Sequence, residues 1–445
     1  ALGATMPEQA MSTEVSVRDL LDHARKQLDQ RAQLDPQVRQ PTQRMLGHLY
    51  TSLGEPKIAA DLFAAGLKRV QPKQKVDALA LAEDYEGYAN ALGAMERGKD
   101  SLDAAQQSAG LRRRFAAGDA EQELRALGAL GFAYYRTGDY TRADTTWTQA
   151  LAVVASLPNP PVDVVTNVYQ GLGSMLGFQG ESARALALAD AGLAFADRRR
   201  LPAASPLRIT LLRLKGDVLV QNGDAATAEA VLRQAIAMQE HAVGKGGVRM
   251  NALYNSLGVA LNELGRYREA VEALAHAGTF DAASGNAPQE AAIGLSNLAS
   301  IWENAGDYPR ALTLFERAIA TLDAAGTSKD EATRRILERN YARSLGLAGR
   351  FDQALPRMQQ LRAYAHRVDG AESFEYAMAT WQSVVLARRM RDPVHGLPLL
   401  DEARLRFGEL VPETHPVFAH MRRARAEFAS QQGDLVLAER EQRAA

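Results

Sequence analysis

Few stretches of this sequence combine residue types that could do chemistry. His366-Arg367-Val368-Asp369 has the order of a protein-kinase catalytic loop, but phosphoryl transfer also needs a Gly-rich loop, a strand lysine and an Asp-Phe-Gly metal ligand, and the sequence has none of these. Gly244-Lys245-Gly246-Gly247 lacks the Ser or Thr that follows the lysine of a phosphate-binding loop. We interpret the first stretch as the end of a surface helix and the second as a flexible loop.

Metal and thiol chemistry have no better support. The absence of cysteine excludes disulfides, thiolate nucleophiles and Cys-containing zinc sites. The 8 histidines are dispersed, and His415 and His420 have an i, i+5 spacing that does not place them on one helix face. We therefore expect no enzyme activity, no metal and no cofactor in this chain.

The charge balance argues against nucleic acid as a partner. Lys plus Arg number 52 and Asp plus Glu number 53, so the net charge of -1 creates no field that would attract a polyanion. Basic clusters at 112–114, 198–200, 388–391 and 422–425 are interpreted as helix ends or solvated faces, with an acidic peptide as the alternative partner for the last cluster. We expect no nucleic-acid binding.

The elements that would position any site follow from length and repetition. A single hydrophobic core stops growing near about 250 to 300 residues, so 445 residues need several domains or an open array. The apolar content of 46% with only 6% aromatics favours closely packed helices. Internal repeats decide between these options.

One repeat is especially clear and follows the tetratricopeptide (TPR) pattern. It comprises Leu127, Leu130, Gly131, Tyr134, Gly138, Tyr140, Ala143, Trp147 and Ala150. The same spacing of Leu, Gly, aromatic and Ala residues recurs over 254–277 and 298–318. Weaker copies of the pattern predict further turns near residues 54, 93, 180, 223, 349, 392 and 433. Most turns are about 41 to 43 residues apart, against 34 in the standard repeat, so each helix gains about one turn.

This pattern predicts an all-α, right-handed superhelical solenoid of about ten long TPR-like helix-turn-helix repeats, with helices of roughly 18 residues. Such long-helix repeats resemble kinesin light chain and bacterial peptide-receptor regulators. Trp147 and Phe315 are expected to fill gaps between repeats, and Gly138-Asp139 to end one helix and cap the next. Inter-repeat loops are expected at 158–161, 201–206 and 244–247.

The opening segment suggests a narrower relationship. Residues 1–40 are predicted to be a lead-in with a capping helix over 14–34 that begins at Ser16, and residues 41–445 the superhelix. Residues 15–22, 34–39 and 46–54 resemble the start of the C-terminal TPR region of bacterial serine/threonine protein kinases. The resemblance implies an upstream kinase domain and membrane span, and a periplasmic or extracytoplasmic location for this part, with the cytoplasm as the alternative. The sequence itself has no apolar stretch long enough to span a membrane.

The remaining candidate for function is the concave face of the first helix of each repeat. Asparagine offers a donor and an acceptor, so a row of asparagines can pair with the main chain of an extended peptide. The alternative is that these amides satisfy only helix ends or water. The predicted groove residues are Phe132, Tyr135, Arg136, Asn255, Asn262, Asn297, Asn304, Arg339, Asn340 and Arg343.

These observations predict a non-catalytic sensor region of a bacterial serine/threonine protein kinase. It would bind a protein or peptide ligand in the groove and control kinase signalling, and a second copy of the chain is a further expected partner, in a homodimer. The alternative is a self-standing TPR scaffold or a peptide-pheromone receptor. A membrane would be involved only through a span upstream of Ala1.

Overall fold

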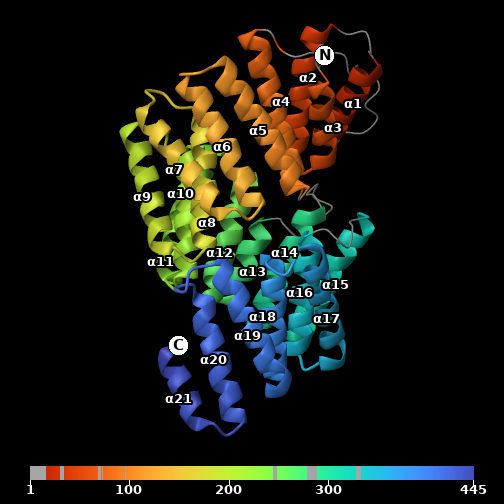
Figure 1. Ribbon diagram of the computed structural model, residues 1–445, viewed down its shortest axis with the longest axis vertical. Helices are drawn as coiled ribbons and strands as arrows, with labels where there is room; N and C mark the ends of the chain where they lie inside the picture. Colours follow the sequence, from red (N-terminus) through yellow and green to blue (C-terminus); the bar gives the residue numbers. More distant parts are fainter. Residues whose placement is uncertain are drawn as a thin grey trace. The chain divides into compact units, whose positions relative to one another are not determined.

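The computed structural model describes residues 17–30, 35–68, 72, 74–95, 97–243, 248–277, 288–326 and 332–445, and every regular element in these ranges is an α-helix (Figure 1). The predicted all-α fold is confirmed. The helices are α1 (Val17–Gln30), α2 (Pro36–Ser52), α3 (Pro56–Leu67), α4 (Lys75–Ala94), α5 (Gly98–Phe115), α6 (Ala120–Arg136), α7 (Tyr140–Ser156), α8 (Val162–Phe178), α9 (Ser182–Arg198), α10 (Pro206–Gln221), α11 (Ala225–Val243), α12 (Val248–Glu263), α13 (Tyr267–Ala277), α14 (Pro288–Asn304), α15 (Tyr308–Ala324), α16 (Ala332–Leu347), α17 (Phe351–Val368), α18 (Phe374–Arg389), α19 (Pro393–Leu410), α20 (Pro416–Gln431) and α21 (Leu435–Ala444).

The turn between paired helices has the predicted chemistry. Gly138 has a φ of 79°, and the Asp139 N–H donates to the Tyr134 carbonyl at 3.0 Å, which closes α6 with a glycine C-cap motif. The Asp139 carboxylate then accepts from the Arg142 N–H at 3.0 Å and caps α7. Asp307 and Asp434 cap α15 and α21 in the same way. Two residues therefore end one helix and start the next.

Two predicted turns differ from the structure. The turn predicted at Gly93 was wrong, because Gly93 lies inside α4 and the chain reverses after it. A Cβ at Gly93 would come within 2.0 Å of Arg136 Nη1, so the glycine makes room for a side chain from α6. In the turn predicted near residue 392, the positive φ of 54° belongs to Arg391, while Asp392 caps α19.

The core confirms that large rings fill the gaps between repeats. Trp147 is fully buried, and added Cβ atoms at Gly131 and Gly171 would come within 2.3 and 2.5 Å of its ring. Since these glycines lie on α6 and α8, the indole of α7 separates the first helices of two successive repeats. Phe315 is also fully buried. Small residues on one helix and a ring on the next therefore set the spacing.

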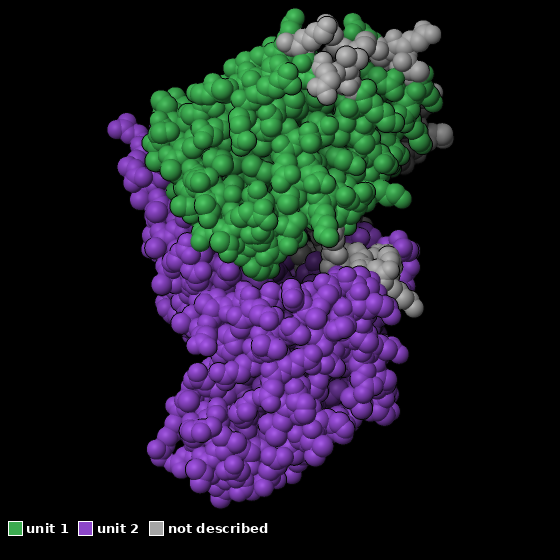
Figure 2. All heavy atoms as spheres, viewed as in Figure 1, with its two compact units in different colours: residues 1–172 green, residues 173–445 purple. Residues whose placement is uncertain are grey.

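The chain divides into two compact units, residues 1–172 (unit 1) and 173–445 (unit 2) (Figure 2). The division falls inside α8, whereas the boundary predicted after residue 40 falls inside α2. The predicted lead-in helix corresponds to α1, and its expected cap Ser16 lies outside the described residues.

The predicted loops have mixed outcomes. The loops at 158–161 and 201–206 do join successive repeats, while 244–247 lies outside the described residues. Among the residues that the structure covers, no helix combines the length and apolarity needed to cross a bilayer.

Unit 2 contains a contact between repeats far apart in the sequence. At the end of α8, the Phe178 ring packs edge-to-face on Phe374 of α18, with 4.5 Å between centroids. Beside it, a Cβ at Gly180 would come within 2.9 Å of the His415 ring. The His415 ring also hydrogen-bonds the Phe178 backbone and accepts from the Val417 N–H at 3.1 Å as the cap of α20. We call this set of residues the closing contact.

Candidate functional site

Alternate helices contact each other within each unit. In unit 1, α4 touches both α2 and α6, and in unit 2 contacts run from α10 to α12 and onward through α14, α16 and α18 to α20. Odd-numbered helices show no comparable contacts with one another in the described parts of the chain. Helices that approach each other this way line the inner side of a curved array. The even-numbered helices therefore provide the candidate inner face.

The exposed face of these helices in unit 2 carries aliphatic side chains. Val259 on α12, Ile293 on α14 and Ile336 on α16 are 40%, 45% and 39% exposed. Ile293 and Asn297 lie four residues apart, as do Ile336 and Asn340, so each pair shares one side of its helix. Aliphatic and amide groups thus alternate along the same face.

Two predicted groove asparagines contact each other. Asn297 on α14 donates from Nδ2 to Asn255 Oδ1 on α12, with 2.7 Å between the atoms. This contact uses one N–H of Asn297 and one lone pair of Asn255. Each amide retains further donor and acceptor capacity in a fixed orientation.

Two predicted groove arginines form ion pairs with neighbouring even-numbered helices. Arg343 on α16 lies 2.9 Å from Glu303 on α14, and Arg339 on α16 lies 2.5 Å from Glu375 on α18. Burial raises the pKa of Glu303, whose side chain is only 3% exposed, while the Arg343 guanidinium acts in the opposite direction. Both arginines are therefore neutralised within the protein.

Polar contacts bridge the flanking helix pairs as well. Asp217 on α10 hydrogen-bonds Ser256 on α12, and burial raises the pKa of Asp217 above its usual range. Arg388 on α18 lies 3.4 Å from Glu427 on α20. Every successive pair of even-numbered helices from α10 to α20 is thus joined by at least one polar side-chain contact. We call this series the polar ladder.

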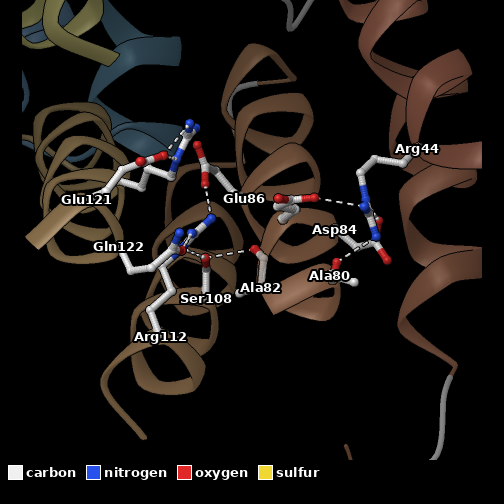
Figure 3. Close-up of polar contacts among 11 residues, drawn as sticks. Arg44, Ala80, Ala82, Asp84, Glu86, Ser108, Arg112, Glu121 and Gln122 are labelled. Carbon is white, nitrogen blue, oxygen red and sulfur yellow. Dashed lines mark hydrogen bonds and ion pairs between the residues drawn. The ribbon is translucent and has the colours of Figure 1, made fainter. Parts of the chain in front are cut away.

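Unit 1 has a related polar network, shown in Figure 3. Arg44 on α2 reaches α4, where its Nε lies 2.7 Å from Asp84 Oδ1 and its Nη2 donates to the Ala80 carbonyl at 2.8 Å. Arg112 on α5 is buried, lies 2.6 Å from Glu86 on α4, and also contacts Gln122 on α6. Burial raises the pKa of Glu86. These groups are mutually satisfied and hold the helices together.

The predicted groove residues of unit 1 belong largely to the packing around Trp147. The Phe132 and Tyr135 rings lie 5.1 and 6.2 Å from the Trp147 ring, measured between centroids. Arg136 is exposed and lies over Phe132, with 5.9 Å from its Cζ to the ring centroid. Their assignment to a ligand groove stays a prediction.

The other predicted asparagines differ in exposure. Asn304 is exposed at the end of α14, and Asn340 is half-buried on α16. Asn262 is half-buried, and its Oδ1 has no hydrogen-bond partner within the described part of the chain. Sequence reasoning missed Ile293 and Ile336, although their repetition one repeat apart was a readable signal.

Sites for other chemistry are not evident in the described ranges. They contain no group of three or more His, Cys, Asp or Glu residues that could hold a metal. His366 and Arg367 lie in the last turn of α17, and Asp369 is its C-cap, as expected for a helix end.

Family models described as tetratricopeptide repeat match residues 210–234, 252–281, 293–322 and 337–360. Tetratricopeptide repeats are therefore present in unit 2. All the matching models describe this repeat, and none describes a catalytic domain. No curated protein sequence matches the chain.

Several solved structures are similar to this chain. A Rap protein in complex with Competence and Sporulation Factor is 12% identical, with a TM-score of 0.54, and the match covers 92% of this chain and 97% of that one. BtubC (BKLC) from P. vanneervenii is 19% identical, with a TM-score of 0.44 and coverage of 52% and 93%. A putative kinesin light chain from Podosopora anserina is 19% identical, with a TM-score of 0.37 and coverage of 45% and 96%. The repeat matches and the similarity to the Rap protein confirm the predicted solenoid of TPR-like repeats.

Proposed function

We propose that unit 2 binds a peptide or an extended protein segment along the exposed face of α12, α14 and α16. The observation that carries this proposal is that three successive even-numbered helices each present an exposed aliphatic side chain, Val259, Ile293 or Ile336, four residues from an asparagine. Exposed apolar groups gathered on one face are typical of interaction sites. The tetratricopeptide repeats matched in this region support a binding role rather than catalysis.

An extended segment fits the dimensions of this face. Packed helices lie about 8 to 10 Å apart and an extended chain rises about 3.3 Å per residue, so crossing three helices takes about six residues. Asparagine amides can pair with main-chain N–H and C=O groups whatever the ligand sequence. The Asn255–Asn297 pair presents such amides, each four residues from an exposed aliphatic residue of its own helix. The Rap protein of similar fold, solved with Competence and Sporulation Factor, is a precedent for ligand binding by this architecture.

A random library of displayed peptides of about twelve residues tests the proposal, because such peptides are long enough to cross the face. We expect wild-type protein to enrich peptides that do not bind the double variant Ile293→Asp, Ile336→Asp. The control is Leu405→Asp on α19, where an exposed leucine, 58% exposed against 45% and 39% for the two isoleucines, lies on an odd-numbered helix. Should the aspartates lower the melting temperature, the milder serine pair repeats the test. Peptides that bind wild type and the double variant equally would place binding elsewhere.

The narrower role as a kinase sensor stays a prediction. It rests on the resemblance of residues 15–54 to kinase-linked TPR regions, and the extracytoplasmic location and the homodimer depend on the same resemblance. The coding sequence upstream of Ala1 tests it. A kinase domain followed by a membrane span supports the sensor, whereas a chain without them supports the scaffold or peptide receptor.

A further inference from the structure

We infer that the segment bound by this face is uncharged and rich in aliphatic side chains, and that its affinity is nearly independent of salt. This inference rests on the proposed function and names the ligand class for the same surface. The argument uses the charges, the apolar groups and the amides of α12, α14 and α16.

The two arginines predicted for this face are already paired within the protein. Arg339 and Arg343 each lie within 2.9 Å of a carboxylate from a neighbouring inner helix. An acidic ligand would have to compete with Glu375 or Glu303, and a basic ligand with the arginines. Breaking a buried ion pair leaves one charge without a partner and is strongly unfavourable. These two arginines therefore contribute little to the selection of an acidic ligand.

The aliphatic groups provide the attraction that the charges do not. Ile293 and Ile336 occupy equivalent repeat positions on successive inner helices, and Val259 adds a third group on α12. Covering these side chains with apolar ligand groups removes apolar surface from water, which is favourable in proportion to its area. Aliphatic ligand side chains maximise this gain without adding a charge.

The asparagine amides can orient a bound peptide through hydrogen bonds that need no charged group on the ligand. In the Asn255–Asn297 pair, one hydrogen bond fixes both side chains, and the second N–H of Asn297 together with the Asn255 amino group can donate to ligand carbonyls. Main-chain groups of any peptide provide these acceptors. Ligand recognition then combines main-chain hydrogen bonds with aliphatic contacts.

Two arginines of the basic cluster near the C-terminus are engaged in internal contacts. Arg425 pairs with Asp401, and Arg422 contacts the Ala444 carbonyl. These internal contacts reduce the attraction of the cluster for an added carboxylate. The acidic-peptide alternative for residues 422–425 stays a prediction, with Arg423 as its exposed arginine.

The experiment reads the composition and salt dependence of the library peptides that need Ile293 and Ile336. We expect these peptides to be enriched in Val, Ile and Leu and depleted in Asp, Glu, Lys and Arg. Their Kd should change by less than about 3-fold between about 0.05 and 0.5 M NaCl, since surface charge attraction would be screened over that range. Ile293→Ala should weaken them by about 3- to 30-fold.

The two proposals fail differently. Face-dependent peptides that are rich in acidic or basic residues, or whose Kd rises more than about 10-fold with salt, would overturn the ligand class and leave the binding face in place. If no enriched peptide depends on Ile293 and Ile336 while Leu405→Asp behaves as wild type, the proposed binding face is wrong. The proposed ligand class is then wrong as well.

Discussion

The ring of Phe178, at the end of α8, packs edge-to-face against Phe374 at the start of α18, with 4.5 Å between the ring centroids. In a linear array each repeat touches only its neighbours, and stability is a sum of local terms. This pair instead joins two repeats separated by several others within unit 2. Phe374 also packs edge-to-face on Phe407 of α19, at 5.9 Å, so the contact continues into the following helix. Unit 2 should therefore unfold more cooperatively than an open array.

We expect Phe178→Ala to lower the free energy of unfolding of unit 2 by about 2 kcal/mol, because a half-buried ring loses its apolar contacts and its aromatic partner. Amide hydrogen exchange at the start of α20 should become faster, although α20 lies far along the chain. Chemical denaturation and exchange measured by mass spectrometry check both effects. The control Leu405→Ala, at an exposed site, should change stability by no more than about 0.5 kcal/mol.

A double-mutant cycle with Phe374→Ala separates the ring contact from general loss of packing. A coupling energy of about 0.5 to 1.5 kcal/mol is expected for a direct aromatic pair. Additive losses would show that the two rings do not stabilise each other.

The second prediction concerns pH and His415. Burial lowers the pKa of His415, so the native state holds the ring neutral while the unfolded chain keeps its usual value of 6.5. Below that value the unfolded state binds more protons, and the stability that His415 contributes is lost as the pH falls. The ring also caps α20 through Nδ1, an acceptor that protonation removes. Wild-type protein should therefore lose stability from pH 7.5 to 5.5.

His415→Asn keeps a capping side chain that does not titrate in this range and should lessen the loss. The comparison uses the difference between the two proteins, because burial also lowers the pKa of His48 and His420. Denaturant midpoints at each pH provide the measurement. Identical pH dependence in both proteins would show that protonation of His415 does not affect the stability of unit 2.

The third prediction concerns the polar ladder. Glu303→Ala should lower the free energy of unfolding by about 2 kcal/mol, because the Arg343 guanidinium, which is 28% exposed, loses a buried carboxylate partner. The control is Glu409→Ala, whose carboxylate is half-exposed and 3.4 Å from Arg406, and the expected change is below about 1 kcal/mol. Denaturation of both variants checks the difference. Equal losses would mean that Glu303 adds no more than a surface charge.

The sequence was sufficient for the repeats and their turns because these depend on local rules. The Gly138-Asp139 turn and the fully buried Trp147 follow from residue types at fixed offsets. The closing contact could not be predicted, since it depends on how small rotations between repeats add up along unit 2. The role of Gly93 was predicted wrongly for a related reason. The sequence does not distinguish a glycine that makes room for the Arg136 side chain from a glycine that forms a turn.

In the candidate site, too, the sequence predicted some features and not others. The phase of the repeat placed Asn255, Asn297 and Arg343 on inner helices, but it did not show which neighbours they meet. Side-chain pairing across helices depends on the offset between repeats, and that offset decides that Asn255 meets Asn297 and that Glu303 meets Arg343. Residues that were predicted to contact a ligand therefore also form hydrogen bonds or ion pairs within the protein.

The last prediction follows from this pairing and uses the peptides enriched by the wild-type protein. Asn255→Ala and Asn297→Ala should each weaken peptide binding by about 2- to 12-fold, the effect of about 0.5 to 1.5 kcal/mol for one hydrogen bond. Because each amide orients the other, the double variant should lose less than the sum of the two single losses, whereas Asn340→Ala on α16 should add independently. Each single change should cost no more than about 1.5 kcal/mol of folding stability. Isothermal titration with one enriched peptide and thermal melts of all variants test these expectations. Strict additivity of Asn255→Ala and Asn297→Ala would show that the amide pair does not act as a unit in binding.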